Sequence, residues 1–328
     1  MRAAFLLFLA TLPGCDKHDH DDHGDETDTT DTTDDTDPAE PTATAFSLDF
    51  VATLNGAEVG CGDTLTGLGP TGIHTVGIND LRFYVSNLVF RDEADEIVPI
   101  TLDENDFQYS GDAGWVALID LTTNAGGDCE PGAISFSEGT ARTHTGVTGT
   151  TLVERVRSVS FDVGIPQGLM KEVIATNTVE GAPSPLAEMY WSWASGYRHF
   201  VVNLTTSDGT TDGEGYLHIG STGCAGDGEL ALETKASCDR VNTPQVALAS
   251  FDLATQQVAV DMGAVFEGMD FVAPVYDPVT YEVIGESVGV ECHASPMQPD
   301  CAAMFSNFGL DLTSGAADPA SNTIFIAQ

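Results

Sequence analysis

Alternation of apolar and polar residues is the main pattern along the chain from residue 42 onward. In "FSLDFVATL", Phe46, Leu48 and Phe50 fall at every second position, so they share one face of an extended strand. Similar runs, rich in β-branched and aromatic residues, lie at 81–90, 115–121, 156–164, 199–204, 245–253 and 257–262. Turn clusters separate them, and only "GLMKEVIA" (168–175) suggests a helix, a short one. The pattern therefore predicts an all-β fold, an antiparallel β-sandwich with long loops over residues 42–328.

The first 41 residues depart from this pattern. Residues 1–14, "MRAAFLLFLATLPG", join one arginine to an apolar run too short to span a bilayer, which predicts a secretory signal peptide. Cys15 follows in "LPGC", which resembles a bacterial lipobox, so we expect a lipid on Cys15; the alternative is a plain signal peptide with a chance cysteine. Residues 15–41 are rich in aspartate, threonine and histidine and lack large apolar side chains, which predicts a disordered tether.

Charge excludes one class of function. The chain has 51 acidic residues against 11 lysines and arginines, a formal charge of −40. Such a chain repels polyanions, so we expect no nucleic-acid partner and no membrane contact except through the lipid anchor. With the signal peptide, this predicts an exported protein, held at the membrane in the periplasm or at the cell surface.

Six cysteines remain after Cys15, and an even count in an exported protein favours disulfides. Their spacing favours local loops at Cys224–Cys238 and Cys292–Cys301, which leaves Cys61–Cys129 as a long-range bridge. A zinc site is the alternative, but no C-x₂-C pair is present. Hydrolase signatures such as G-x-S-x-G and H-E-x-x-H are also absent, so we expect no enzyme.

The stretch "MYWSWASGYRHF" gathers aromatic and soft side chains in an otherwise acidic chain. Met189, Trp191 and Trp193 stand at alternate positions, so a strand would place them on one face. His199 would join them if the register continues through the following turn. Methionine sulfur and neutral imidazole suit Cu(I) rather than calcium or magnesium. The alternative is that the tryptophans fill a sandwich core.

His218 is the other candidate ligand. It stands in "GYLHIGSTGC" between Leu217 and Ile219, so an alternating strand would point its imidazole away from these two apolar side chains. A lone strand histidine is otherwise a structural residue.

Several blocks together resemble the MbnP-like copper-binding family, also called the metallo-mystery pair four-Cys-motif proteins. The resemblance spans roughly residues 46–312 and rests on "LRFYVSNLVF", "WVALIDL", "PLAEMYWSWASGYRHF", "LHIGSTGC" and "ECHASPMQPDCAAMFSNFGLDL", in this order. It implies a secreted β-rich protein that binds one copper ion. It also implies a partner, a di-haem enzyme related to cytochrome c peroxidases, that oxidises a tryptophan to kynurenine, which joins histidine in binding copper. The matching residues are His218, Trp191 and Trp193.

One block departs from the family pattern. Family members usually carry an Asn-His pair after a "G-V-P" turn, whereas here the turn is "VGIPQGLMKEVIA" and the next histidine is His199. If that histidine is a copper ligand in the family, this chain either lacks the ligand or replaces it with Met170 or His199. We expect a lipid-anchored copper protein, with Cu(I) as its ion. The alternative is a metal-free surface adhesion module that binds a glycan or protein through the aromatic stretch.

Overall fold

The computed structural model describes residues 41–122, 144–176, 185–186, 188–191, 196–225 and 235–328. Pro41–Gln328 forms one compact unit. The expected features outside the described residues are the signal peptide (1–14), Cys15, nearly all of the tether (15–41), Cys129 and Trp193.

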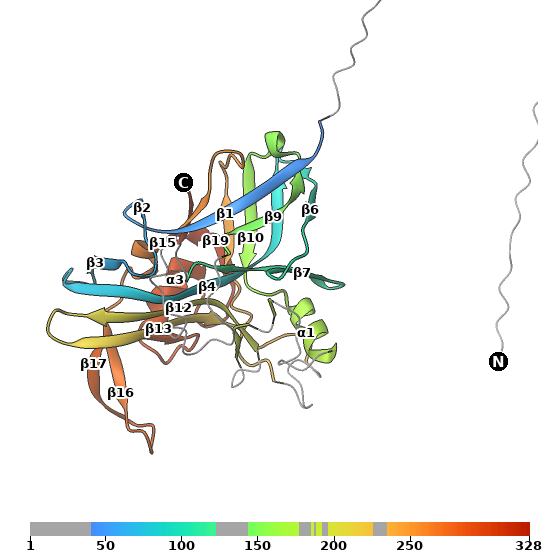
Figure 1. Ribbon diagram of the computed structural model, residues 1–328. Coiled ribbons are helices and arrows are strands. Elements are labelled where there is room, and N and C mark those ends of the chain that lie inside the picture. The colour runs from blue at the N-terminus through green and yellow to red at the C-terminus, as the bar shows by residue number, and fades with distance from the viewer. Residues whose placement is uncertain (1–40, 123–143, 177–184, 187, 192–195, 226–234) are drawn as a thin grey trace, which may run out of the picture. The chain divides into compact units, whose positions relative to one another are not determined.

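Two large β-sheets build this unit (Figure 1). The smaller sheet has the order β20 (Phe325–Ala327), β15 (Val258–Asp261), β1 (Thr44–Leu54), β9 (Gly146–Thr151) and β6 (Ile100–Leu102), with β2 (Ala57–Glu58) paired to β1. The larger sheet has the order β14 (Gln245–Leu248), β10 (Ser158–Val163), β4 (His74–Arg91), β12 (Gly196–Ser207), β13 (Asp212–Gly220), β17 (Val283–His293) and β16 (Val272–Tyr276). Shorter strands join it at β4, β8 and β12: β3 (Thr64–Leu68), β5 (Ile97–Val98), β7 (Gln108–Gly111), β8 (Gly114–Asp120) and β11 (Tyr190–Trp191).

The remaining elements are short. They are the helices α1 (Gln167–Thr176), α2 (Met262–Val265) and α3 (Cys301–Asn307), the 3-10 turn Val153–Arg155, and the strand pair β18 (Phe308–Leu310) and β19 (Ala317–Asn322). Within the described ranges, no helix is both long and apolar enough to cross a bilayer.

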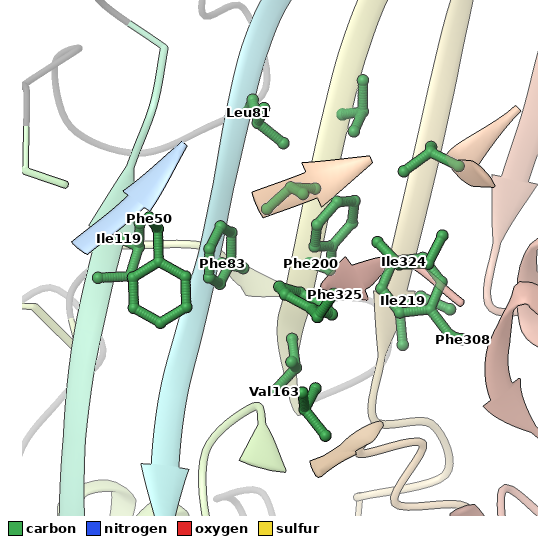
Figure 2. Close-up of a cluster of buried hydrophobic side chains, with 14 of the residues drawn as sticks. Phe50, Leu81, Phe83, Ile119, Val163, Phe200, Ile219, Phe308, Ile324 and Phe325 are labelled. Atoms are coloured by element: carbon green, nitrogen blue, oxygen red, sulfur yellow. The ribbon is translucent and has the colours of Figure 1, made fainter. Parts of the chain in front are cut away.

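A core of aromatic and branched side chains fills the space between the two sheets (Figure 2). Phe50 of β1 and Phe325 of β20 meet Phe83 of β4 edge to face, with ring centroids 5.4 and 5.5 Å apart. Phe200 of β12 stacks beside Phe83 at 5.8 Å. Each ring is almost completely buried, and burying a side chain of this size contributes roughly 1.5–3 kcal/mol. The core therefore covers one face of the large sheet and holds its strands in place, which also positions the side chains on the opposite face.

The fold class expected from the sequence is confirmed, with one difference in topology. β1 carries Phe46, Leu48 and Phe50 into the core at alternate positions, as predicted. Most strand pairs are antiparallel, but β1 pairs with β15 and β13 pairs with β17 in parallel. A parallel pair needs a long crossover connection, so local alternation does not reveal it.

Two of the expected disulfides form, Cys224–Cys238 and Cys292–Cys301. Cys61 is buried and disulfide-bonded. The Cys292–Cys301 bridge joins the end of β17 to the first residue of α3, and therefore holds the strand end that carries His293.

The hairpin of β16 and β17 extends beyond the neighbouring β13 (Figure 1). Its apolar side chains are largely exposed, including Val279 at 83 % and Tyr281 at 78 %. Only the last part of β17, from Gly289 to His293, pairs with β13. The hairpin thus contributes little to the core, while the end of its second strand is built into the sheet.

Candidate metal centre

The two faces of β13 differ in chemistry. Leu217 and Ile219 are buried in the core between the sheets. His218 lies between them in the sequence and on the opposite face, and it is only 3 % exposed. The orientation that alternation predicted for His218 is therefore found, although the side chain is covered rather than open to solvent.

A second imidazole lies against His218. The parallel pairing of β13 with β17 places His293 directly beside His218, with their Nδ1 atoms 3.0 Å apart and their ring centroids 4.9 Å apart. His293 is not among the ligands expected from the sequence. Its one local signal is its position next to Cys292, in a block that resembles the copper-binding family.

Both imidazoles are neutral at pH 7. Burial lowers the pKa of His218 well below its usual value, and the neighbouring His293 and the Arg198 guanidinium lower it further. Burial, together with Arg198, lowers the pKa of His293 to about 4. A neutral imidazole keeps a lone pair on one ring nitrogen, which is the form that binds a metal ion.

Trp191 packs over the histidine pair. Its ring centroid lies 6.0 Å from that of His218 and 6.3 Å from that of His293, and the residue is 6 % exposed. Gly220 makes this approach possible: a Cβ atom there would lie 2.8 Å from Trp191 Cζ3 and 2.7 Å from the Tyr197 carbonyl oxygen. A second aromatic ring also packs against the pair.

Tyr216 contributes this second ring. Its ring stacks on His293 with a centroid distance of 6.1 Å and an interplanar angle of 22°. The phenol donates a 2.5 Å hydrogen bond to Glu214, and burial followed by this bond raises the pKa of Tyr216 to about 12. Tyr216 therefore remains a neutral phenol at physiological pH.

A row of buried polar side chains continues from His218 across the sheet. His218 Nε2 lies 2.8 Å from Asn203 Oδ1, and Asn203 Nδ2 donates to Asp80 Oδ2 at 3.3 Å. Arg82 donates to both carboxylate oxygens of Asp80, at 2.8 and 3.0 Å. Its Nη1 also donates to Glu188 at 2.9 Å. These five residues are at most 6 % exposed, so the charge of Arg82 is balanced inside the protein by two carboxylates.

Other expected ligands are placed elsewhere. His199 accepts a hydrogen bond at Nδ1 from the Ile165 amide, 3.3 Å away, while its Nε2 lies 2.7 Å from Ser221 Oγ and 3.1 Å from the Val241 carbonyl oxygen. Both ring nitrogens of His199 therefore lie within hydrogen-bond distance of partners inside the protein, and its role as a metal ligand stays a prediction.

Met189 and Met170 both lie among buried apolar side chains. Met189 has a positive φ of 49°, which interrupts the alternation before β11. Its side chain lies in a second hydrophobic cluster, together with Tyr84, Tyr197 and Met170. Trp191, in contrast, packs against the two histidines and against side chains of the main core cluster.

Two further observations limit what this centre can be. In the parts of the chain that the structure describes, no group of three or more His, Cys, Asp or Glu side chains is placed to hold a metal ion. Among the described residues, the histidine pair therefore offers two protein ligands, the imidazoles of His218 and His293.

The aromatic stretch itself is mostly covered. Trp191, Tyr197 and Phe200 are buried, so the described part of "MYWSWASGYRHF" forms no exposed aromatic patch.

Comparisons with known proteins agree on one family. The family model MbnP matches residues 43–281, a range that contains Trp191 and His218 and ends before His293. Among solved structures, MbnP from Methylosinus trichosporium is similar with a TM-score of 0.64 and 27 % sequence identity. That match covers 87 % of this chain and 98 % of the Methylosinus protein. No curated protein matches the chain.

Proposed function

Because the chain belongs to the MbnP family, we propose that it is an exported, non-catalytic protein that binds one copper ion at His218 and His293. The observation that carries this proposal is the contact between two buried imidazoles whose Nδ1 atoms are 3.0 Å apart. Both imidazoles are neutral at pH 7, so metal binding does not first require an imidazolium ion to be deprotonated.

The donor set fits copper, as Cu(I), better than the other common metals. Calcium and magnesium take oxygen ligands, and a structural zinc site takes four protein ligands. Within the described residues, no larger cluster of His, Cys, Asp and Glu accompanies the two imidazoles. Cu(I) binds soft and imidazole donors and is stable with few of them. When bound, the copper would supply a redox-active or transferable metal ion.

Oxidation of Trp191 to kynurenine would add donors to this pair. The indole nitrogen only donates hydrogen bonds, whereas kynurenine carries an aromatic amine and a ketone with lone pairs. Trp191 lies close to both imidazoles, so its oxidation product would stand at the same place. Trp193 remains a second candidate for this modification.

A partner di-haem enzyme related to cytochrome c peroxidases would perform the oxidation, with hydrogen peroxide as the oxidant. Two molecules of peroxide deliver two oxygen atoms, break the bond between C2 and C3 of the indole, and leave two molecules of water. Hydrolysis of the resulting N-formyl group then releases formate and leaves kynurenine.

Export and anchoring complete the proposal. The disulfides are typical of an oxidising compartment. A lipid on Cys15, followed by the acidic tether, would hold the β unit at the periplasmic or outer cell surface.

Copper titration of the purified protein tests the function. The chain beginning at residue 41 should take up one Cu(I), while His218→Ala and His293→Ala should each abolish high-affinity uptake. His144→Phe is the matched control, because it removes an imidazole but keeps an aromatic ring stacked on Phe107. Uptake that survives both alanine variants, or that requires the histidines of the tether, contradicts the proposal.

Mass spectrometry tests the modification separately. Protein from a host that has the di-haem partner should show kynurenine in the peptide that contains Trp191, and protein made without that partner should not. Unmodified tryptophan in both samples would exclude the oxidation while leaving copper binding by the two histidines intact.

A further inference from the structure

We infer that Asn203 and Asp80 are positioning residues of the copper site: they keep the proton of His218 on Nε2 and so present its Nδ1 lone pair to the position shared with His293. The inference rests on the proposed copper site for its purpose, but its geometry concerns this chain alone. His218 Nε2, Asn203 and Asp80 form one continuous hydrogen-bonded series.

The direction of each hydrogen bond follows from the carboxylate. An ionised aspartate accepts hydrogen bonds and donates none, so the Asn203 amide must turn its NH₂ group towards Asp80. The Oδ1 atom of Asn203 then faces His218 Nε2 at 2.8 Å. Because an amide oxygen only accepts, Nε2 must carry the proton and Nδ1 must carry the lone pair.

Arg82 holds the carboxylate in this orientation. Its Nε and Nη2 atoms donate to the two oxygens of Asp80, and the Thr122 hydroxyl donates to Oδ1 at 3.1 Å. Asp80 and Arg82 are completely buried. Because both oxygens of Asp80 are held by these donors, the carboxylate has a fixed orientation, and this orientation sets the direction of the Asn203 amide.

The same guanidinium reaches the segment that carries Trp191. Arg82 Nη1 donates to Glu188, and the Tyr84 hydroxyl donates to the Glu188 carbonyl oxygen at 2.7 Å. The buried guanidinium of Arg82 therefore contacts both Asp80, which orients Asn203 behind His218, and Glu188, which lies just before β11. The positions of the His218 imidazole and of the Trp191 indole thus depend on the same buried arginine.

Such support is physically important for a two-imidazole site. Asn203 removes the neutral tautomer of His218 that carries its proton on Nδ1. The 3.0 Å contact is then donated by His293 Nδ1, so only the His293 proton has to leave Nδ1 when a metal binds. Partners behind a ligating histidine commonly change metal affinity by about 10- to 100-fold. Without Asn203, His218 would divide its proton between its two ring nitrogens.

The test combines ¹⁵N NMR of the copper-free protein with Cu(I) titration. In the unmodified sequence, His218 should carry its proton on Nε2. Asn203→Leu, which has a similar volume but no acceptor, should show a mixture of tautomers and bind Cu(I) about 10- to 100-fold more weakly.

Thr206→Val is the matched control, because Thr206 is a buried residue of the same strand and the change removes its partly buried hydrogen bond to the Thr75 carbonyl oxygen. It should change neither the tautomer nor the affinity. The inference is overturned if His218 carries its proton on Nδ1 in the unmodified protein, or if Asn203→Leu behaves like Thr206→Val. Protein that binds no Cu(I) but shows the expected change of tautomer contradicts the copper function and supports the positioning role.

Discussion

His218 and His293 lie side by side on the parallel strands β13 and β17, with 3.0 Å between their Nδ1 atoms although 75 residues separate them in the sequence. Each strand contributes one imidazole, so neither strand alone brings two imidazoles together. Since the pair exists only in the folded chain, a metal ion that binds it must stabilise the folded state against the unfolded state.

Copper should therefore raise the thermal stability of the protein. At a free Cu(I) concentration about 100 times Kd, the expected gain is about 2.7 kcal/mol. His293→Ala should abolish this gain, while His144→Phe should keep it. Thermal unfolding with and without Cu(I) measures the effect under reducing conditions that spare the disulfides. An equal copper-induced rise in Tm for His293→Ala would exclude His293 as a ligand.

Gly220→Ala should disturb the contact between Trp191 and the histidine pair. The added Cβ atom would lie 2.8 Å from the indole and 2.7 Å from the Tyr197 carbonyl oxygen. Such overpacking costs typically about 1–3 kcal/mol, measured by urea unfolding. Gly285→Ala is the control, because a Cβ atom there would have no atom of the described chain within 4 Å beyond its own sequence neighbours, and it should be neutral. Equal stability of the two variants would contradict the close packing of Trp191.

His199 should make the copper-free protein less stable in acid. Burial lowers the pKa of His199 from 6.5 to about 4, so between these values the unfolded chain binds a proton that the folded protein does not. Its stabilising contribution, about 3 kcal/mol, is complete above pH 6.5, decreases as the pH falls and is lost near pH 4.

His199→Gln isolates this contribution, because an amide can still donate to the Val241 carbonyl oxygen but does not titrate in this range. The free energy of unfolding should fall less steeply between pH 6.5 and 4 in the variant than in the unmodified protein. The remaining slope includes His218 and His293, whose pKa values are also lowered. Identical slopes would mean that His199 has the same pKa in the folded and the unfolded state, which contradicts the lowering by burial.

The core between the sheets should be sensitive to truncation and the hairpin should not. Phe200→Ala removes a ring that packs on Phe83 and on Phe308, at centroid distances of 5.8 and 4.7 Å. The expected loss is about 3–5 kcal/mol. Val279→Ala, at a side chain that is 83 % exposed, should change the free energy of unfolding by less than about 0.5 kcal/mol. Denaturant unfolding compares them, and similar losses would contradict the packing described.

Local sequence patterns predicted much of the fold because alternation acts within a single strand. Phe46, Leu48 and Phe50 reach the core as expected, and "GLMKEVIA" lies within α1. The two short-range disulfides also form as their spacing favoured. Each of these features depends on residues that are near neighbours along the chain, so the order of residues contains enough information to predict them.

The sequence by itself determined that the chain is β-rich, that it belongs to the MbnP family, and that His218 turns away from the core. Only the tertiary structure decided what His218 meets. The parallel pairing of β13 with β17 brings His293 to it, while backbone partners occupy His199 and a positive φ takes Met189 out of the alternation. The physical reason is distance along the chain: side-chain alternation follows from one strand's geometry, whereas a two-residue site depends on which distant strands pair and in which register.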